Sequence, residues 1–224
     1  MKIAALVSGG KDSIYAAWLA AKKHDLLCFV SLISKNPDSF MFHTENIRLV
    51  EKIAEACNLP LVMGKTKGEK EKELEDLKTL LEGLNIDGIS VGAIASDYQY
   101  DRISKICHEL HLKVFAPLWK IDAKKYMKSL IKNGFDVIIT KVAAEGFDES
   151  WLGRKIDSKC LKDLETLNRE RGIHIAGEGG EYETFVLDCP LYRKKIKITK
   201  AAKKWNKGVG SLLVKNVKLI DKDL

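Results

Sequence analysis

Six consecutive residues near the N-terminus, Ser8-Gly9-Gly10-Lys11-Asp12-Ser13, have the composition of a phosphate-binding loop. Two glycines let the backbone approach phosphate oxygens closely, a lysine adds a point charge, and serine hydroxyls add hydrogen-bond donors. The loop follows an apolar run and precedes a segment with helical spacing. A doubly wound sheet presents backbone N–H groups and a helix N-terminus to an anion at this position. We therefore predict that residues 8–13, the phosphate loop, bind the phosphates of a nucleotide.

The aspartate of the phosphate loop indicates what accompanies the nucleotide. A Walker A motif does not fit, because Ala5 stands where its first glycine belongs and Asp12 replaces the Ser or Thr after Gly-Lys. A carboxylate beside a phosphate is repulsive unless a cation lies between them, so Asp12 is the candidate ligand of Mg²⁺. The alternative is a plain glycine turn in which Asp12 or Ser13 caps the helix.

A second polar loop, residues 92–99, follows the apolar run Ile86–Val91. Ligands of an open parallel sheet bind at the carboxyl ends of the strands where the strand order reverses, so this second loop is expected to face the phosphate loop. A glycine at the strand end and three polar side chains are its candidates: Gly92, Asp97, Gln99 and Arg102. The polar side chains are suited to position an α-phosphate or its attacking group. Alternatively, Asp97 caps a helix that begins near Arg102.

An acidic, glycine-rich segment lies in the C-terminal half. Residues 177–183, the acidic loop, read Gly177-Glu178-Gly179-Gly180-Glu181-Tyr182-Glu183 and place three glutamates in a chain of net charge +7. This contrast favours a ligand site over a simple turn. Trp119 and Trp151 are the aromatic residues expected at an interface between lobes, with core packing as the alternative.

Three histidines are candidates for a site. His43 follows a loop that contains Pro37. Its position alone indicates a residue that caps a helix or packs in the loop. His108 and His111 share a helix face but lack a third nearby ligand, so we interpret them as a surface pair rather than a metal site.

The elements that must position these residues follow from hydrophobic periodicity. Short apolar runs predict buried strands at Lys2–Ser8, Leu26–Ile33, Ile86–Val91 and Phe135–Val142. Three- and four-residue spacing predicts helices at Ser13–Lys23, Glu45–Cys57, Glu69–Leu84, Arg102–His111, Ala123–Lys132 and Ser158–Arg171. This alternation predicts an α/β, Rossmann-like parallel sheet of five strands with helices on both faces.

The pattern changes in the C-terminal part. Late strand-like stretches occur at Lys195–Ala201 and Leu212–Leu219, and the alternation Lys195-Ile196-Lys197-Ile198 predicts a half-exposed antiparallel edge. We expect a smaller mixed α+β lobe there. The domain boundary is placed between residues 1–118, an ATP-binding domain, and residues 119–224, a substrate-binding domain.

Composition narrows the class of protein. The 224 residues are 46% hydrophobic and 31% charged, which excludes a disordered or collagenous chain. Five cysteines without a C-x-x-C pair offer neither a disulfide framework nor a zinc ribbon, so a cytoplasmic location is expected. No apolar run is long enough to span a bilayer. The charge of +7 suits a polyanionic ligand, although much of it is lysine interleaved with glutamate on helix faces.

The phosphate loop resembles the PP-loop of ATP pyrophosphatases, and the whole chain resembles the diphthine–ammonia ligase, or diphthamide synthetase, family. The resemblance covers residues 1 to about 190 and rests on six stretches: residues 8–13, Met41-Phe42-His43, Gly92 to Arg102, Pro117-Leu118-Trp119, Trp151-Leu152-Gly153-Arg154 and Gly177 to Thr184. It implies a HUP-type fold, ATP and Mg²⁺. The implied reaction amidates diphthine, a modified histidine of translation elongation factor 2, through an acyl-adenylate that ammonia resolves with release of AMP.

The resemblance also suggests roles for individual residues. The expected catalytic residues are Lys11, Asp12 and Asp97, with Asp12 as the metal ligand. The expected nucleotide-binding residues are Ser8, Gly9, Gly10, Lys11, Asp12, Ser13, His43 and Gly92. The expected substrate-binding residues are Gln99, Arg102, Trp119, Trp151, Glu178, Glu181, Tyr182 and Glu183.

We expect the acidic loop to recognise the trimethylammonium group of diphthine. That group cannot donate N–H hydrogen bonds, so aromatic faces and carboxylates are its natural partners. Tyr182 between Glu181 and Glu183 has this chemistry, and Glu178 or Glu183 is an alternative proton acceptor from ammonium. The competing interpretation is that Tyr182 packs in the core and the glutamates cap helices.

Two other functions remain open at this stage. A tRNA-modifying PP-loop enzyme would benefit from the positive charge, but the chain lacks a zinc-binding cysteine cluster, and the acidic loop would repel RNA. A nucleotide-binding sensor without catalysis has less need of Asp12. Nucleic acid is therefore not a required partner, no membrane partner is expected, and a homo-oligomer is left open.

Overall fold

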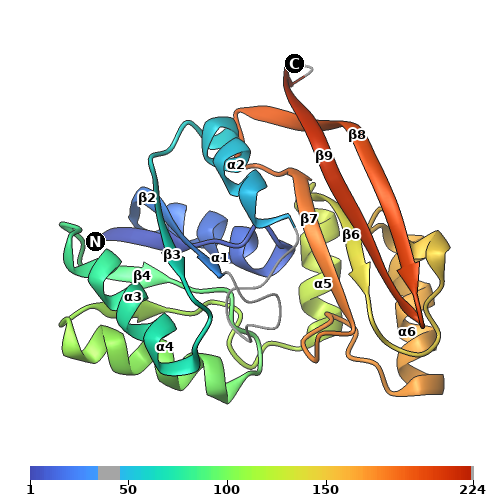
Figure 1. The fold of residues 1–224 in the computed structure, drawn as a ribbon, viewed down its shortest axis with the longest axis horizontal. Helices are drawn as coiled ribbons and strands as arrows, with labels where there is room; N and C mark the ends of the chain where they lie inside the picture. The colour runs from blue at the N-terminus through green and yellow to red at the C-terminus, as the bar shows by residue number, and fades with distance from the viewer. Residues whose placement is uncertain (35–45, 223–224) are drawn as a thin grey trace. The chain divides into compact units, whose positions relative to one another are not determined.

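A computed structural model describes residues 1–34 and 46–222 of the chain. The chain divides into two compact units, Met1–Trp119 and Lys120–Leu224 (Figure 1). Within the described residues, no helix is long and apolar enough to cross a membrane.

Unit 1 is built on a parallel five-stranded sheet, as the sequence predicts. Its strands are β1 (Lys2–Leu6), β2 (Asp25–Ser34), β3 (Leu61–Thr66), β4 (Gly88–Ser90) and β5 (Lys113–Phe115). Its helices are α1 (Lys11–Ala21), the short η1 (Ile47–Leu49), α2 (Val50–Cys57), α3 (Lys70–Glu82) and α4 (Asp97–Glu109). The strand order is β3-β2-β1-β4-β5, so the chain reverses direction across the sheet between β1 and β4.

Alternating side chains of the strands pack against helices on the two faces of this sheet. Leu77 and Leu81 of α3 join one apolar cluster with Val30 and Ile89 of the strands. Residues that alternate with this set, such as Ile3 and Ala5 of β1, are also fully buried; α1 packs on β1 and β2. Burial on both faces explains why these strands read as continuous apolar runs.

Unit 2 contains an antiparallel sheet of order β7-β6-β9-β8. Its strands are β6 (Asp136–Val142), β7 (Tyr182–Asp188), β8 (Lys194–Asn206) and β9 (Val209–Asp221). Its helices are α5 (Ala123–Lys132), the short η2 (Glu149–Trp151) and α6 (Ser158–Arg171). β8 lies at the edge of the sheet, which confirms the antiparallel edge predicted from its alternating lysines and isoleucines.

Several element boundaries differ from the sequence prediction. β3 was not predicted, because Gly64 and Lys65 break its short apolar run. The run at Phe135–Val142 does form a strand, but β6 belongs to the antiparallel sheet of unit 2. α4 begins at Asp97 rather than near Arg102, since its polar first turn lacks an apolar face. Tyr182 and Glu183, expected in a loop, belong to β7.

A tight turn joins the two long strands at the end of the chain. Lys207 and Gly208 connect β8 to β9, and both have positive φ, 48° and 83°. Positive φ at both central residues is the type I′ geometry that matches the twist of a hairpin.

Candidate nucleotide site and acidic loop

The phosphate loop lies between β1 and α1, at the carboxyl end of the strand beside which the sheet reverses its order. Gly9 has φ 88°, a left-handed conformation that glycine adopts without strain. Gly10 is the N-cap of α1 and provides no side-chain hydrogen bond. The alternative of a helix capped by Asp12 or Ser13 is therefore wrong, and the positive end of the helix dipole points toward the loop.

The two serines of this loop hold its backbone. The hydroxyl of Ser13 accepts from Ser8 N at 3.2 Å and donates to the Gly10 carbonyl oxygen at 3.1 Å. The hydroxyl of Ser8 accepts from Gly10 N at 3.4 Å. We expected both hydroxyls to donate to phosphate. In this structure their hydrogen bonds to described residues lie within the loop, because a tight glycine turn leaves its N–H and carbonyl groups within reach of short side chains.

The charged pair of the loop is partly buried. The side chain of Lys11 is 2% exposed, and its Nζ lies 2.9 Å from Oδ2 of Asp12, whose side chain is 31% exposed. Lysine is rarely this buried without an anionic partner. Asp12 is thus the anionic partner that the buried Lys11 requires, and part of its own carboxylate stays exposed to solvent.

The second loop touches the phosphate loop through Gly92. A Cβ atom placed on Gly92 would lie 2.6 Å from both the Asp12 carbonyl carbon and the Ser13 nitrogen. No side chain fits at that distance, so glycine is required for the two loops to meet. β4 pairs directly with β1, which brings the loops to the same crevice.

The structure places the other candidates of the second loop on α4. Asp97 is the first residue of the helix and Arg102 is half-buried. The rings of Tyr100 and Trp119 stack with centroids 4.3 Å apart and an interplanar angle of 19°. Sequence analysis missed Tyr100, which holds Trp119 against this helix. The side chain of Gln99 and the whole of His43 lie outside the described residues.

The aromatic residues of unit 2 are packed inward. Tyr182 is 3% exposed, and its hydroxyl donates to the Ile175 carbonyl oxygen at 2.7 Å. Phe147 lies between Tyr182 and the buried Trp151, with ring centroids 6.0 and 4.8 Å away, respectively. The packing interpretation of Tyr182 therefore fits this structure, because the ring is buried next to Phe147 and Gly177 and the hydroxyl is hydrogen-bonded within the unit. Trp151 is likewise buried and does not lie at the surface.

The glutamates of the acidic loop have three different environments. Oε1 of Glu181 accepts from His174 N at 2.7 Å, while Oε2 is buried without a hydrogen-bond partner among the described residues. Glu183 pairs with Lys141 of β6 at 3.0 Å. Glu178 is half-buried in the turn itself. The interpretation that these glutamates cap helices is wrong for Glu181 and Glu183, whose contacts are with the loop and the neighbouring strand.

His174 organises the acidic loop and was missed in the sequence. Its Nδ1 accepts from the backbone N–H groups of Ala176 and Glu178, both at 3.3 Å. Nδ1 must be unprotonated to accept, so the neutral ring carries its proton on Nε2. A histidine three residues before a glycine turn gives no sequence signal for this role, because the bonds depend on the fold of the loop.

The stretch Trp151-Leu152-Gly153-Arg154 is held together by contacts of its own side chains. The guanidinium of Arg154 lies 4.4 Å from the ring centroid of Trp151 and pairs with Asp163 of α6. Its charge is therefore used to hold the chain after η2 against α6.

The cysteines do not resemble catalytic thiols. All five are free and buried. Burial raises the pKa of the Cys107 thiol to about 11, and it raises the pKa values of Cys160 and Cys189 to about 12. A nucleophilic cysteine requires a lowered pKa, so none of these three is suited to thiolation chemistry at neutral pH.

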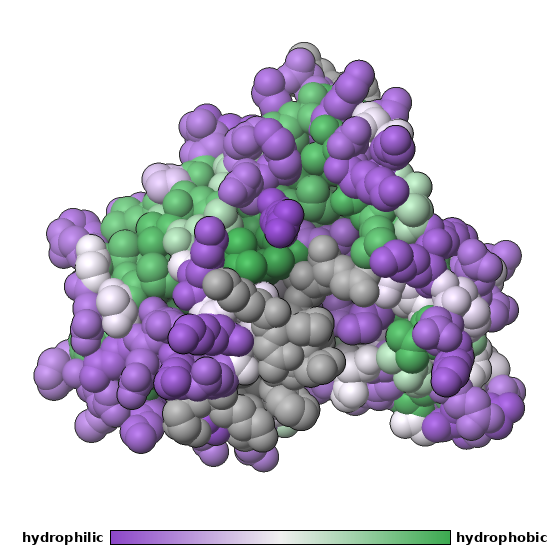
Figure 2. All heavy atoms as spheres, in the orientation of Figure 1, coloured by the Kyte–Doolittle hydropathy of each residue, from purple (hydrophilic) through white to green (hydrophobic). Residues whose placement is uncertain are grey.

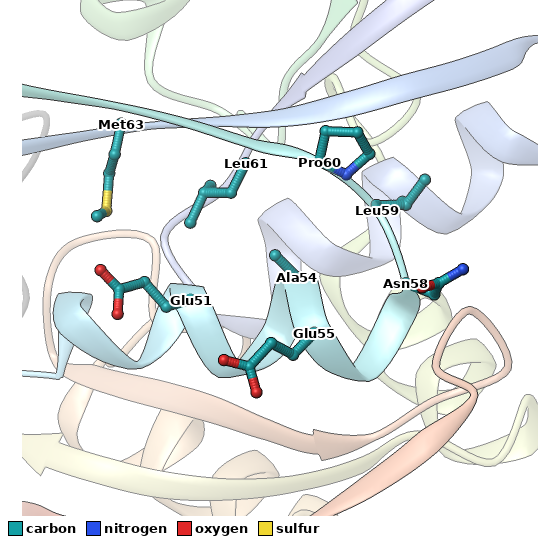
Figure 3. Close-up of a pocket in the computed structure, with 8 residues that line it drawn as sticks. All are labelled: Glu51, Ala54, Glu55, Asn58, Leu59, Pro60, Leu61 and Met63. Carbon is teal, nitrogen blue, oxygen red and sulfur yellow. The ribbon is translucent and has the colours of Figure 1, made fainter.

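Unit 1 also has an open groove. It has a volume of about 670 Å³ and lies between α2 and the first half of β3 (Figure 3). Its charged side chains are Glu51 and Glu55, which would repel phosphate, and Met63 is partly exposed beside them. The groove lies toward the amino end of β3, whereas the phosphate loop lies at the carboxyl end of β1.

The chain matches two family models, the diphthamide synthase N-terminal domain over residues 1–114 and the diphthamide synthase C-terminal domain over residues 122–220. It is 39% identical over 220 residues to the diphthine–ammonia ligase of Bos taurus, covering 88% of this chain and 82% of that protein. The Danio rerio diphthine–ammonia ligase is 38% identical, covering 88% and 86%. The Saccharomyces cerevisiae protein of that name is 33% identical over 86% of this chain and 34% of its own length.

Proposed function

The chain belongs to the diphthamide synthase family, and from this premise we propose that it is a diphthine–ammonia ligase that uses ATP to convert diphthine to diphthamide. The observation that carries the proposal is the contact between the two loops at the reversal of the sheet, where Gly92 lies against the backbone of Asp12 and Ser13. This crevice is where an open α/β sheet binds its ligand.

The proposed chemistry has two steps. The carboxylate of diphthine attacks the α-phosphate of ATP, forming an acyl-adenylate as pyrophosphate leaves. Ammonia then attacks the acyl carbon, AMP leaves, and the proton lost by nitrogen passes to a nearby base or to water. The first step brings two anions together, so it needs fixed positive charge more than a protein nucleophile.

The residues of the phosphate loop supply that positive charge. Lys11 is held by its burial and by Asp12, so its ammonium is positioned before the nucleotide arrives. Gly9 and Gly10 bring backbone N–H groups to the phosphates, with the N-terminus of α1 behind them. Ser8 and Ser13 fix the loop from within.

Magnesium fits this loop in a limited way. No group of three or more His, Cys, Asp or Glu side chains capable of holding a metal exists in the described part of the chain. Mg²⁺ commonly takes one or two carboxylates together with substrate phosphates and water. Asp12 is the residue that would hold it, and the ion would neutralise phosphate charge.

On the substrate side, we propose that the carboxylates of the acidic loop, rather than the ring of Tyr182, attract the cationic end of diphthine. Glu178 and Glu183 are half-buried rather than enclosed, whereas Tyr182 is in the core. The proposed protein substrate is translation elongation factor 2 bearing diphthine, and the proposed location is the cytoplasm.

Release of AMP and pyrophosphate tests the function directly. The protein is incubated with ATP, ammonium and either diphthine-bearing elongation factor 2, the unmodified factor or bulk tRNA. Stoichiometric AMP and amidated factor with the first substrate alone is the expected result. AMP release that depends on tRNA would support a tRNA-modifying enzyme instead, and nucleotide binding without any turnover would support a sensor.

A further inference from the structure

The positive charge of this chain is concentrated in one element. Residues 193–222, which we call the basic ribbon, contain β8, β9 and their turn. The ribbon holds eleven Lys and Arg residues against a single acidic residue, Asp221. The remaining residues hold 27 Lys and Arg against 30 Asp and Glu, so outside the ribbon the chain is slightly negative. The net charge of +7 is therefore a property of the ribbon and not of the whole surface.

Much of the ribbon is paired only with itself. β8 and β9 pair from Lys194↔Asp221 to Asn206↔Val209, whereas β9 pairs with β6 only at Gly210 and Ser211. The half of the ribbon near the C-terminus thus extends beyond the register of β6. In the space-filling view, hydrophilic side chains flank a narrow strip of hydrophobic ones at that end (Figure 2).

Lysines in the half of the ribbon near the C-terminus lower the stability of the folded protein. Lys197 and Lys218 are exposed and lie directly opposite each other on the paired strands. Like charges in such a cross-strand pair are destabilising. Lys200, three residues after Lys197 on β8, is also exposed and adds another positive charge to this half of the ribbon.

Acidic side chains relieve little of this repulsion. Among the described residues, the ion pairs of the ribbon lie where β8 begins and β9 ends, between Lys194 and Asp221 and between Lys222 and Asp188. Lys197, Lys200 and Lys218 form no ion pair with any described residue. Some helix lysines, by contrast, pair with glutamates, as Lys52 does with Glu55.

Protection of an open sheet edge explains only part of the pattern. Lysines on an edge strand discourage pairing with another chain, which accounts for some of those on β8. Lys215 and Lys218 are on β9, which pairs with β8 on one side but, beyond Ser211, has no described strand paired on its other side. Edge protection can therefore account for single lysines on either strand, but it does not require two lysines directly opposite each other.

We propose that the basic ribbon is the docking surface for an acidic face of the protein that carries diphthine. This inference rests on the proposed function. Lysines are point charges that attract carboxylates at a distance and accelerate encounter. The ribbon has one aromatic residue, Trp205, whose ring lies on Gly210, so it lacks the row of exposed rings on which nucleic acid bases stack. An acidic protein surface therefore matches the ribbon better than a single-stranded RNA does.

A charge-neutralised ribbon tests the proposal. The variant Lys197→Gln/Lys200→Gln/Lys215→Gln/Lys218→Gln removes four exposed charges from it. The matched control Lys128→Gln/Lys132→Gln/Lys159→Gln/Lys162→Gln removes four exposed charges from α5 and α6 of the same unit. Binding of elongation factor 2, with and without diphthine, and binding of a duplex RNA are measured at low and high salt, and turnover is measured at saturating ATP.

The ribbon variant should bind the factor about tenfold more weakly at low salt, with a smaller salt dependence, and KM for the factor should rise while kcat and KM for ATP hold. The control should behave as the unaltered protein does. Thermal unfolding of the ribbon variant should occur at the same or a higher temperature, because opposed charges are removed. This last measurement separates lost docking from lost folding.

The outcomes distinguish this inference from the proposed function. If the ribbon variant released AMP normally with an unchanged KM for the factor, the docking proposal would be wrong and the proposed ligase function would be unaffected. Weakened binding of the factor by the ribbon variant, in a protein that never releases AMP, would support the docking surface and contradict the ligase. Equal losses in both variants, or ribbon-dependent binding of duplex RNA in place of the factor, would also overturn the proposal.

Discussion

The phosphate loop and the acidic loop are both glycine-rich turns that carry charged side chains, but they use those side chains differently. In the phosphate loop, the serines hold the backbone and Asp12 keeps a partly exposed carboxylate at the reversal of the sheet. In the acidic loop, Tyr182 and Glu181 turn inward and stabilise the turn itself. Residue type alone therefore does not distinguish a side chain that contacts a ligand from one that stabilises the loop.

The largest effect should come from Asp12→Ala. Loss of the carboxylate removes the proposed ligand of Mg²⁺ and releases Lys11 from its ion pair, so AMP formation should fall by roughly a hundredfold to a thousandfold or more. The melting temperature should also fall, because the buried ammonium of Lys11 loses its anionic partner, so AMP formation is compared at a temperature where both proteins remain folded. Asp25→Ala, an exposed carboxylate at the amino end of β2, is the control and should leave turnover intact.

If Asp12→Ala retained normal AMP release, the phosphate loop would lose its assigned metal role. The comparison between the loops would then rest on geometry alone.

A second large effect is expected from Gly92→Ala, because the new Cβ would meet the backbone of Asp12 and Ser13 at 2.6 Å. The two loops must move apart, and affinity for ATP should fall by roughly tenfold to a hundredfold, a loss that equilibrium nucleotide binding would measure. Gly83→Ala at the end of α3 is the matched control, since the nearest atom to its Cβ is 3.8 Å away. Equal ATP affinity in the two variants would contradict the contact.

The phosphate loop could be predicted from sequence because its chemistry is contiguous and its position follows from the strand-loop-helix pattern. The parallel sheet was predictable for the same reason: apolar runs such as Ile86–Val91 alternate with helical spacing. β3 escaped prediction because Gly64 and Lys65 interrupt it. Which residues of the acidic loop face inward could not be predicted from the sequence. The burial of Tyr182 and the hydrogen bonds of His174 depend on partners that only the fold brings together.

A moderate effect is expected at His174, and its size tests whether the acidic loop is a substrate site. His174→Ala removes the acceptor of two backbone N–H groups, so the loop should loosen and KM for diphthine-bearing factor should rise roughly several-fold. His174→Asn restores an acceptor near the position of Nδ1, whereas His174→Gln places its amide near Nε2. Asn should therefore recover most of the lost affinity and Gln should not.

Steady-state kinetics with each substrate varied in turn would measure these effects. KM for ATP should not change in any of the three His174 variants. A rise in KM for ATP alone would indicate that the acidic loop contacts the nucleotide rather than the protein substrate.

The smallest effect is expected from Tyr182→Phe, which keeps the ring and removes the hydroxyl. Tyr182→Ala would not separate the two roles of this residue, because it opens a cavity in the core as well as removing an aromatic face. In Tyr182→Phe the Ile175 carbonyl oxygen loses its donor at 2.7 Å, so the free energy of unfolding should fall by about 1 kcal/mol. Tyr192→Phe, whose hydroxyl bond to Val186 is longer at 3.3 Å, should cost less. Denaturant unfolding measures both, and KM for the diphthine-bearing factor should stay constant. A raised KM with unchanged stability would place the Tyr182 hydroxyl in contact with substrate and make the two loops alike after all.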